Sequence, residues 1–471
     1  MKILLINPPR LNEIIGNNHS IIEEERGYNP PLGLLYIAAF MKEHTKHNVS
    51  VIDSQVGNLD YSSLKARVVS IQPDIVGITA MTMTMVDVIN TAKIVKEINN
   101  TIKVVLGGPH VNLFPDETIK LKNVDYLVLG EGEAVFVDFI NAVDNKTKLE
   151  EIPGLVFENN GKIINTGQRP MISDLDKLPF PARHLVPYKK YTSLLSKGSV
   201  VTTIFTSRGC PFKCSFCSRP HLGKIFRARS SVNVVDELEA CTKLGIYEFL
   251  IYDDTFTVNR GRVIDICNEI IRRKLNIGWD IRARVDTVDE EVIVHLKKAG
   301  CQGIHYGVEA GTDKILRILN KGITISQVRE IFNLTRKYRI PILAYFMIGI
   351  PEETLEDIYQ TFKVMKDLNP DYVHITILTP FPGTNIYFDG LRNGVIKKDY
   401  WKEFAKNPTS GFVPPHWAEF FTLEELKIFL AKGYKSFYFR PAYIFKRICA
   451  LRSFGEFRKK AVAAAKVLVM Q

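Results

Sequence analysis

Short apolar runs alternate with longer amphipathic stretches through the first 145 residues. Five of these runs are rich in Val, Ile and Leu and are candidate strands: Lys2–Asn7, Val49–Asp53, Asp74–Thr79, Lys103–Gly107 and Asp125–Leu129. Amphipathic stretches such as Leu32–His44 and Met85–Ile98 lie between them and predict helices. Strands that are apolar on both faces are typical of a parallel sheet covered by helices on both sides. Residues 1–145 are therefore predicted to form a doubly wound, Rossmann-like α/β domain.

A different pattern occupies residues 146–195. The stretch LVFENNGKIIN predicts a β-hairpin that turns at Asn160 and Gly161. The stretch DKLPFPARHLVPYKKY is rich in proline and predicts a linker. We therefore expect a hairpin and a linker between two larger units.

A second series of strands and helices runs from residue 196 to residue 390. Six runs are candidate strands: Val201–Ser207, Glu248–Tyr252, Gly278–Arg284, Gly303–Val308, Ile342–Ile348 and Tyr372–Leu378. Six β/α units predict a partial, open (β/α)6 barrel of the TIM type, with its chemistry at the carboxyl ends of the strands. Residues 391–471 lack this rhythm, and their aromatic and basic composition predicts a mainly helical region.

Composition and charge narrow the class of protein. The 471 residues are 46% hydrophobic and 24% charged, as in a globular protein of two or three domains. No secretory signal is recognisable and no apolar run reaches the ~20 residues of a membrane span, so a cytoplasmic protein is expected. The net charge is +11, and residues 431–471 hold ten basic residues against one acid. If the chain has a basic surface that contacts a partner, we therefore expect that surface to be confined to this tail.

Three of the seven cysteines form a cluster. Cys210, Cys214 and Cys217 are spaced C-x3-C-x2-C directly after the first barrel strand, and no cysteine precedes them. One tight cluster within an odd number of cysteines favours a metal or redox site over a disulfide framework. A structural zinc site usually has four ligands, whereas the other cysteines are isolated and are expected to pack as small apolar side chains. Three thiolates suit a [4Fe–4S] cluster with one open iron, with zinc or a bare thiol cluster as the alternatives.

In this spacing the chain resembles the radical S-adenosylmethionine (radical SAM) superfamily. The resemblance implies that the three cysteines hold a [4Fe–4S] cluster and that the amino and carboxylate groups of S-adenosylmethionine bind the open iron. It also implies that Phe216, which precedes the last cysteine, packs near the adenine. The position of the motif after the first strand of a β/α barrel supports the resemblance.

Acidic and basic residues at the next strand ends agree with this resemblance. Asp253 or Asp254 in IYDDTFT is expected to meet the amino group of S-adenosylmethionine, although paired acids at a strand end are also common helix N-caps. Arg282 and Arg284 lie on one face of the third barrel strand. Either arginine could bind a cofactor carboxylate or pair with an acid of the chain.

Two later motifs extend the resemblance. Glu309 in YGVEAG is expected to bond the ribose hydroxyls rather than to serve as a structural acid. The backbone at Gly349 and Ile350 in FMIGIPEET is expected to lie against the adenine, because glycine permits close approach.

The amino-terminal unit resembles the cobalamin-binding domain that some radical SAM enzymes carry. The resembling stretches are NPP, NPPLGLLYIAAFMK, LGGPH and LGEGE. The resemblance implies contacts with cobalamin from residues that follow the strands, namely Pro8, Gly107, Gly108, Pro109, Gly130 and Gly132. Glycines at these ends would let a flat macrocycle lie close to the backbone, although alone they indicate only a generic Rossmann loop.

One motif departs from that pattern. Many cobalamin proteins use D-x-H-x-x-G, whose histidine binds the cobalt, whereas this chain reads DSQVG with Gln55 near that position. We therefore expect cobalamin without a protein histidine on the cobalt, and we expect His110 to be a surface residue rather than a neighbour of the corrin. The absence of cysteine before Cys210 also excludes the second cluster of methylthio-transferring enzymes that modify transfer RNA.

Together these motifs predict a cobalamin-dependent radical SAM enzyme that methylates an unactivated carbon. An electron donor of the flavodoxin or ferredoxin type is expected to charge the cluster, and a 5′-deoxyadenosyl radical is expected to take a hydrogen from the substrate. The alternatives are an oxidative cyclase or rearrangement enzyme with the same cofactors, similar to the anaerobic porphyrin cyclase, and a non-catalytic cobalamin carrier or sensor. The cysteine cluster argues against the carrier or sensor.

The composition of the basic, aromatic tail gives an indication of the class of substrate. Residues 435–471 predict either a membrane-surface contact or a helical cap over the barrel. The substrate is accordingly expected to be a small molecule or a lipid. No nucleic acid is expected, because no RNA-binding module is recognisable.

Overall fold

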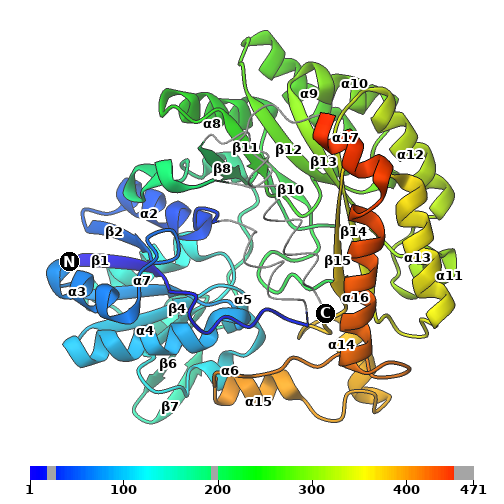
Figure 1. Ribbon diagram of the computed structural model, residues 1–471. Coiled ribbons are helices and arrows are strands. Elements are labelled where there is room, and N and C mark those ends of the chain that lie inside the picture. Colours follow the sequence, from blue (N-terminus) through cyan, green and yellow to red (C-terminus); the bar gives the residue numbers. More distant parts are fainter. Residues whose placement is uncertain (18–27, 193–199, 450–471) are drawn as a thin grey trace.

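The computed structural model describes residues 1–17, 28–192 and 200–449. Two sheets with their helices lie side by side, the first in blue to cyan and the second in green to yellow (Figure 1). The first sheet is Rossmann-like and the second is a six-stranded partial barrel. The predicted fold class is therefore confirmed.

The first sheet has the strand order β2-β1-β3-β4-β5-β6-β7. Its parallel strands are β1 (Lys2–Asn7), β2 (Asn48–Asp53), β3 (Ile75–Thr79), β4 (Lys103–Gly107) and β5 (Tyr126–Val128). Its helices are α2 (Leu32–His44), α3 (Tyr61–Ile71), α4 (Met85–Ile98), α5 (Pro109–Leu113), α6 (Pro115–Thr118) and α7 (Gly132–Asn145), with a 3-10 turn η1 (Thr82–Thr84) before α4.

Both faces of this sheet are buried, which explains why its strands are apolar at nearly every position. In β1, Ile3 and Leu5 pack against α2 and α7 on one face. Leu4 and Ile6 pack against α3 and α4 on the other face. Successive side chains of a strand point to opposite faces, so a strand between two helical layers needs an apolar residue at each step.

The hairpin predicted after residue 146 is present and extends the first sheet. β6 (Leu155–Asn159) and β7 (Lys162–Asn165) pair with each other, and β6 pairs antiparallel with β5. Asn160 and Gly161 both have positive φ, at 52° and 76°, as a two-residue type I′ turn requires. The first sheet is therefore mixed. Short 3-10 turns flank the hairpin and form the linker: η2 (Leu149–Glu151), η3 (Leu175–Lys177), η4 (Arg183–Leu185) and η5 (Tyr188–Lys190).

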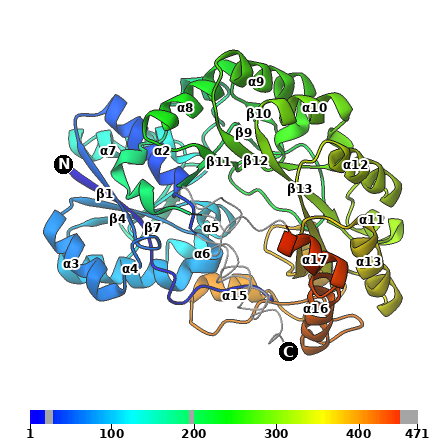
Figure 2. The ribbon, with the colours of Figure 1, turned by 45° about the horizontal axis from the view of Figure 1, so that its top comes forward.

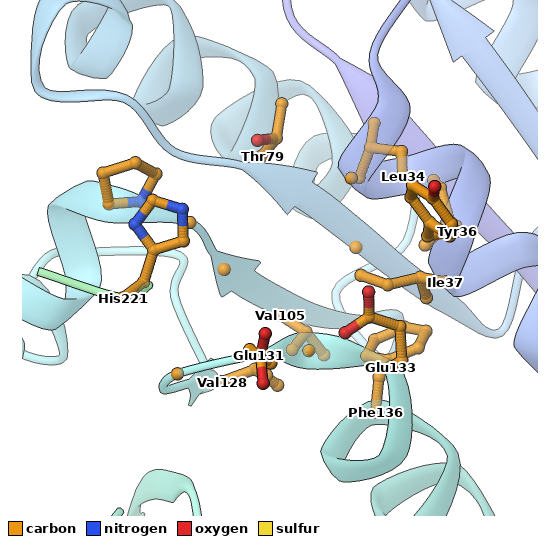
Figure 3. Close-up of a pocket in the computed structure, with 18 of the residues that line it drawn as sticks. Leu34, Tyr36, Ile37, Thr79, Val105, Val128, Glu131, Glu133, Phe136 and His221 are labelled. Atoms are coloured by element: carbon orange, nitrogen blue, oxygen red, sulfur yellow. The ribbon is translucent and has the colours of Figure 1, made fainter. Parts of the chain in front are cut away.

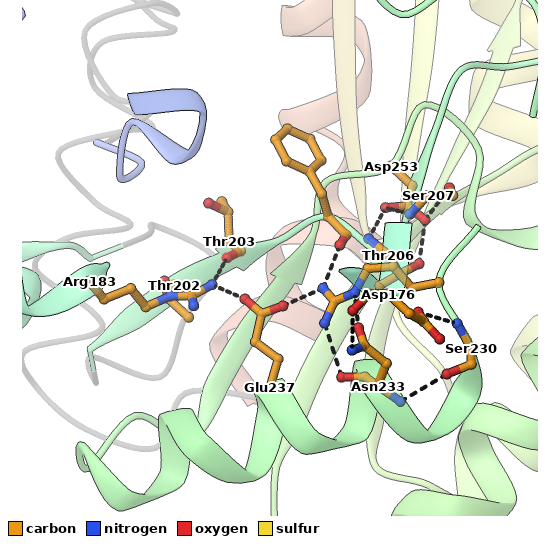
Figure 4. Close-up of polar contacts among 12 residues, drawn as sticks. Asp176, Arg183, Thr202, Thr203, Thr206, Ser207, Ser230, Asn233, Glu237 and Asp253 are labelled. Carbon is orange, nitrogen blue, oxygen red and sulfur yellow. Dashed lines mark hydrogen bonds and ion pairs between the residues drawn. The ribbon is translucent and has the colours of Figure 1, made fainter. Parts of the chain in front are cut away.

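A buried ion network ties this linker to the barrel (Figure 4). Glu237, which is fully buried, forms an ion pair with Arg183 of the linker at 2.6 Å and accepts a hydrogen bond from Arg229. Burial by itself would raise the pKa of Glu237, but the two guanidinium groups hold it below its usual range. Arg183 also donates to the carbonyl of Thr203 at 2.9 Å, and Arg229 donates to that of Phe205 at 2.9 Å. The network therefore fixes the chain that leads into the cysteines.

The second sheet has the order β15-β14-β13-β12-β11-β8, and all of its neighbouring strands are parallel. Its strands are β8 (Val201–Ile204), β11 (Glu248–Ile251), β12 (Gly278–Ala283), β13 (Cys301–Glu309), β14 (Ile342–Ile348) and β15 (Tyr372–Ile377). Helices cover its outer face (Figure 2): α8 (Ser231–Lys243), α9 (Arg260–Arg272), α10 (Glu290–Lys298), α11 (Asp313–Ile318), α12 (Ile325–Lys337) and α13 (Leu355–Leu368), with 3-10 turns η6 (Phe256–Val258) and η7 (Val285–Thr287).

The two faces of the barrel sheet differ in polarity. On β12, Trp279 and Ile281 are buried in the core that the outer helices share. Asp280 and Arg282 alternate with them, lie on the inner face and are only half-buried. The barrel therefore presents polar side chains to its interior, and its carboxyl end faces the first sheet.

The open edge of the barrel, at β15, is sealed by α16 (Leu423–Tyr438). The Tyr434 hydroxyl accepts from the N–H of Ile375 at 2.8 Å and donates to its carbonyl at 3.0 Å. Tyr438 pairs with Val373 in the same way, at 3.0 Å for both bonds. Four helical residues rise about 6.0 Å and two strand residues about 6.6 Å, so the two spacings match. The two hydroxyls thus replace the strand that a closed barrel would have here.

The remaining helices join the two halves. They are α14 (Asn385–Arg392), α15 (Tyr400–Lys406) and α17 (Pro441–Cys449). Trp401 and Phe404 of α15 enter the hydrophobic core of the first sheet, where α15 contacts α6 (Figure 1). In the described ranges, none of these helices or the earlier ones has both the length and the apolar character to cross a membrane. The expected membrane contact of residues 435–471 lies outside the described residues from position 450 onward.

Candidate active site

The three cysteines lie in the loop that follows β8 and the short strand β9 (Ser207–Arg208), at the carboxyl end of the barrel. The strand β9 pairs antiparallel with β10 (Arg227–Ala228), which closes the loop at its base. All three cysteines are free thiols; Cys210 is buried, whereas Cys214 and Cys217 are partly buried. The N–H of Cys217 donates to the carbonyl of Cys214 at 3.2 Å, so these two lie in one tight turn.

Cationic side chains lie beside two of the three sulfurs. Arg219 donates to Sγ of Cys217 at 3.0 Å, and Arg284 donates to Sγ of Cys214 at 3.5 Å. Burial raises the pKa of Cys217 to about 11, and Arg219 only partly opposes it. The free thiol is therefore protonated at neutral pH. The two guanidinium groups are placed to stabilise sulfur in its anionic, metal-bound form.

The loop supplies three cysteine sulfurs, the number that a [4Fe–4S] cluster with one open iron takes from its protein. In the described part of the chain, no three His, Cys, Asp or Glu side chains converge in a way that would hold one metal ion. A tetrahedral zinc ion binds every sulfur at about 2.3 Å, so its ligands must meet at one point. In a [4Fe–4S] cluster each thiolate binds a different iron, and the donors need not converge in this way.

Asp253 holds the start of the cysteine loop. Its carboxylate is buried and accepts hydrogen bonds from the N–H groups of Thr206 at 2.7 Å and Ser207 at 3.1 Å. The hydroxyls of the same two residues donate to it at 2.5 and 2.6 Å. Four donors thus occupy both oxygens, and in this structure Asp253 braces the chain that leads to Cys210. Its expected contact with S-adenosylmethionine stays a prediction.

Asp254 and Arg282 lie together at the mouth of the barrel. Desolvation and Asp253 raise the pKa of Asp254, and Arg219 and Arg282 partly offset the rise. The Arg282 guanidinium lies 3.9 Å from the centre of the Tyr252 ring, and among the described residues it forms no ion pair within 4.0 Å. Of Arg282 in β12 and Arg284 just after it, Arg282 is therefore the one left to bind a carboxylate.

Arg284 has a different role in the structure. Its Nε and Nη2 donate to the two carboxylate oxygens of Asp286, at 2.9 and 2.8 Å, and Nη2 also donates to the carbonyl of Lys321 at 2.5 Å. It lies 3.8 Å from the centre of the Phe212 ring within the cysteine loop. Arg284 thus follows the alternative in which the arginine pairs with an acid of the chain. It contacts the cysteine loop at Cys214 and Phe212.

Glu309 and Phe216 are brought together by a residue that the sequence did not single out. Lys321 donates to Oε1 of Glu309 at 2.6 Å and lies 5.7 Å from the centre of the Phe216 ring. A side chain at Gly307 would come within 2.4 Å of Glu309, so the glycine makes room for the ion pair. Lys321 lies three residues after α11 (Asp313–Ile318) ends, in the turn sequence NKG, which gives no sequence signal for a site.

The motif around Gly349 and Ile350 is braced from within the chain. Their N–H groups donate to Glu353 at 2.6 and 3.1 Å. Gly349 has φ of 76°, and a side chain there would lie 2.9 Å from Leu426 of α16. Burial raises the pKa of Glu353 to about 8. Sequence reasoning identified the glycine but missed this buried carboxyl.

A cavity of about 230 Å³ lies where the first sheet meets the cysteine loop. Its barrel side comprises Phe216 and residues from the ends of β14 and β15, namely Met347, Thr376, Ile377, Leu378, Thr379 and Phe381. Its other side comes from the first half of the chain: Glu13, Ile14, Ile15, Gly16 and Met83. The expected adenine neighbour Phe216 therefore lies in a cavity that both halves of the chain build.

The interior of the barrel holds a second set of residues that the sequence analysis did not name. His305 lies 3.5 Å from Asp280, and its Nδ1 is 3.3 Å from the Tyr345 hydroxyl. The Tyr345 ring packs edge-on against His374, with ring centres 5.6 Å apart. The signal for these residues was the alternation of polar and apolar positions within the later barrel strands.

The expected cobalamin residues mostly line one cavity, of about 190 Å³, between α2, α7 and the strand ends of the first sheet (Figure 3). Its lining includes five of the six predicted residues: Gly107, Gly108, Pro109, Gly130 and Gly132. Gly130 has φ of 69° and open space where a side chain would lie, whereas a side chain at Gly108 would come within 3.0 Å of the Ala80 carbonyl. Asn112 joins the two glycine loops, since it donates to the Gly108 carbonyl at 2.9 Å and accepts from the Gly130 N–H at 2.7 Å. A backbone cradle of this kind fits a flat ligand.

Pro8 and Gln55 lie beside each other at the ends of β1 and β2. Nε2 of Gln55 donates to the Pro8 carbonyl at 3.3 Å and to Oδ1 of Asn7 at 3.2 Å. Pro8 is not part of the cavity lining. The expectation for His110 was wrong: it is fully buried, its Nδ1 is 3.1 Å from the Thr82 hydroxyl, and burial lowers its pKa to about 3.

Comparison with known protein families supports both cofactor sites. The model of the radical SAM superfamily matches residues 204–365, and that of the B12 binding domain matches residues 19–140. The uncharacterized methyltransferase PH0819 of Pyrococcus horikoshii is 36% identical over 454 residues, which cover 95% of each chain. The anaerobic magnesium-protoporphyrin IX monomethyl ester cyclase of Rubrivivax gelatinosus is 31% identical over 395 residues, 82% of this chain and 69% of the cyclase.

Two solved structures share the fold at lower identity. The radical S-adenosylmethionine methyltransferase TsrM of Kitasatospora setae has a TM-score of 0.69 at 18% identity, covering 84% of this chain and 78% of TsrM. The cobalamin-dependent radical enzyme OxsB has a TM-score of 0.73 at 16% identity, covering 99% of this chain and 72% of OxsB.

The fold and the site thus define a radical SAM enzyme with a B12-binding domain. The chain belongs to the radical SAM superfamily, in the group that joins this barrel to a B12-binding domain. Its cofactors are a [4Fe–4S] cluster, S-adenosylmethionine and cobalamin, as the cysteine motif and the glycine loops predicted. The assignment of individual residues to each cofactor stays a prediction.

Proposed function

We propose that this enzyme methylates an unactivated carbon of a small-molecule or lipid substrate. The observation that carries the proposal is the resemblance to the methyltransferase PH0819 along 95% of both chains, with both cofactor sites in one molecule. When bound, the cofactors supply reductive cleavage of S-adenosylmethionine and a transferable methyl group.

The chain's own residues position the cysteine loop, stabilise charge on its sulfurs and line the space beside them. Asp253 and Arg284 hold the cysteine loop at its start and middle, and Arg219 and Arg284 stabilise negative charge on sulfur. Arg282 is the candidate partner for a cofactor carboxylate. The cavity beside Phe216 is walled mainly by apolar side chains from both halves of the chain.

A second candidate reaction is oxidative cyclisation. It is favoured by the 31% identity with the anaerobic magnesium-protoporphyrin IX monomethyl ester cyclase, which spans 82% of this chain. Both reactions would need an electron donor of the flavodoxin or ferredoxin type. A peripheral membrane contact through residues 435–471 remains part of the proposal for a lipid substrate.

Labelled S-adenosylmethionine separates the two reactions. With a deuterated S-methyl group, a methylase leaves three deuterium atoms in the product and releases S-adenosylhomocysteine along with 5′-deoxyadenosine. A cyclase releases 5′-deoxyadenosine alone and leaves no label in its product. The test is run on the reconstituted full chain with candidate substrates, and an unlabelled product would overturn the methylase proposal.

A further inference from the structure

A buried ion bridge joins the cobalamin cavity to the cysteine loop. Arg208 donates from Nη1 to Glu131 at 2.8 Å and from Nη2 to Glu133 at 2.5 Å. Glu131 and Glu133 belong to the LGEGE stretch after β5, Glu131 as the N-cap of α7 and Glu133 in its first turn, whereas Arg208 lies in β9. All three side chains are at least nine-tenths buried. We call Arg208, Glu131 and Glu133 the interdomain bridge.

The cobalamin side of the bridge is part of the cavity wall. Glu131, Glu133 and Arg208 all line the cavity that Gly130 and Gly132 also line. Figure 3 shows the two glutamates in its wall. The guanidinium of Arg208 lies 5.4 Å from the centre of the Tyr36 ring, which also lines it. A ligand that fills the cavity therefore contacts the bridge directly.

On its other side the bridge is connected to the cysteine loop through a short and tightly packed backbone segment. Gly209 alone separates Arg208 from Cys210 and has φ of 78°. A side chain at Gly209 would lie 2.2 Å from the carbonyl of Ile225, so the backbone here is tightly enclosed. On the preceding side, Ser207 is held by Asp253. A shift of Arg208 is thus passed to Cys210 and is not absorbed by a flexible segment.

The partners of Glu131 extend the same connection. Its second oxygen accepts from Arg227 at 2.8 Å and from the N–H of Ile172 at 2.7 Å. Arg227 lies opposite Arg208 in the β9–β10 pair, so both arginines reach Glu131 from one two-stranded ladder. Both oxygens of this carboxylate are therefore anchored by the cluster half of the chain and by the linker.

We propose that the interdomain bridge couples the two cofactor sites, with Arg208 as the positioning residue: cluster binding and cobalamin binding each favour the arrangement that the other needs. Coupling of this kind is reciprocal, because the free energy that links two binding sites is the same in both directions. The proposal rests on the two cofactor sites and not on the reaction, so it stands or falls independently of methyl transfer.

The test measures the affinity for hydroxocobalamin of the full chain with and without its cluster. For the wild type we expect about tenfold tighter binding when the cluster is present, within the usual range of coupling between sites. For Arg208→Gln this ratio is expected to fall to within twofold of one, and Arg208→Lys, which keeps the charge, should retain part of it.

Two further variants keep the test decisive. Arg273→Gln removes ion pairs with Asp236 and Glu239 between the outer helices α8 and α9, none of which lines the cobalamin cavity, and it should retain the wild-type ratio. Glu133→Gln removes the charge of the glutamate but keeps a hydrogen-bond acceptor. It replaces Arg208→Gln in the test if that variant does not fold, and its ratio is also expected to fall toward one. A wild-type ratio near one, or an unchanged ratio in the folded bridge variants, would overturn the proposal.

Discussion

The hydroxyl of Tyr434 in α16 bonds both backbone groups of Ile375 in the edge strand β15, accepting at 2.8 Å and donating at 3.0 Å. Ile375 is buried, so loss of this hydroxyl leaves an N–H and a carbonyl unpaired away from water. Each unpaired group costs about 1–3 kcal/mol.

Tyr434→Phe is therefore expected to lower the free energy of unfolding by about 2–6 kcal/mol. Urea unfolding followed by circular dichroism measures it. Tyr359→Phe, at a tyrosine of α13 that is 45% exposed, is the control and should change the value by less than about 0.5 kcal/mol. Equal effects of the two variants would show that the edge strand does not depend on the hydroxyl.

The raised pKa of the buried Glu353 carboxyl makes the stability of the folded chain depend on pH. Burial raises its pKa from 4.5 to about 8, so the folded chain keeps a proton that the unfolded chain releases between these two values. This contribution is fully present below pH 4.5 and is lost as the pH rises toward 8, by at most about 1.4 kcal/mol per pH unit. Glu353→Gln cannot ionise, and its stability should fall less between pH 5 and pH 8 than that of the wild type.

The measurement for Glu353 is urea unfolding at pH 5, 6.5 and 8. Glu356→Gln is the matched control, because Glu356 lies three residues further along the chain, in the first turn of α13, and is exposed. A pH profile of Glu353→Gln that overlays the wild type would mean that this carboxyl is already ionised in the folded protein.

The cysteine loop predicts which thiols carry iron. Cys214→Ala should abolish formation of 5′-deoxyadenosine and leave far fewer than the roughly four irons per chain of a reconstituted [4Fe–4S] protein. Cys241→Ala should retain the wild-type iron content, because burial raises the pKa of Cys241 to about 11 and keeps it a neutral core side chain. After anaerobic reconstitution, iron analysis measures the iron content of each variant and chromatography measures the 5′-deoxyadenosine that it forms. Full iron in Cys214→Ala would remove it from the ligand set.

A pair of glycines tests where cobalamin lies. Gly130 and Gly245 have φ of 69° and 80°, and both have open space where a side chain would stand. Alanine at either should therefore cost a similar backbone strain of about 1 kcal/mol. Only Gly130 lines the cobalamin cavity, so Gly130→Ala alone should weaken hydroxocobalamin binding, by tenfold or more. If titration of the apoprotein gives the same affinity for both variants, the macrocycle does not lie against Gly130.

Local patterns were enough to predict most elements of the fold. The bounds of β1, β4, α2 and α4 coincide with the stretches identified from the sequence. The reason is physical: a strand buried on both faces is a continuous apolar run, and an amphipathic helix repeats every 3.6 residues. The cysteine motif was also predictable, because its three ligands lie within eight residues.

Contacts between distant residues were not predictable in this way. Arg208 and Glu131 are 77 positions apart, and nothing in either local stretch marks the other as its partner. Asp253 accepts from four donors of Thr206 and Ser207, which lie 47 and 46 positions away, and its expected contact with the cofactor stays a prediction. His110 was expected at the surface, yet the loop after β4 folds inward and buries it.

The sequence by itself determined the two α/β units, the three thiols and the glycine loops, because each depends on periodicity or on residues close together in the chain. Only the tertiary structure decided which polar side chains remain available to a ligand, such as Arg282, and which are consumed as braces, such as Arg284. That distinction depends on where every neighbouring donor and acceptor lies in space, and a buried polar group takes whatever partner the packing provides.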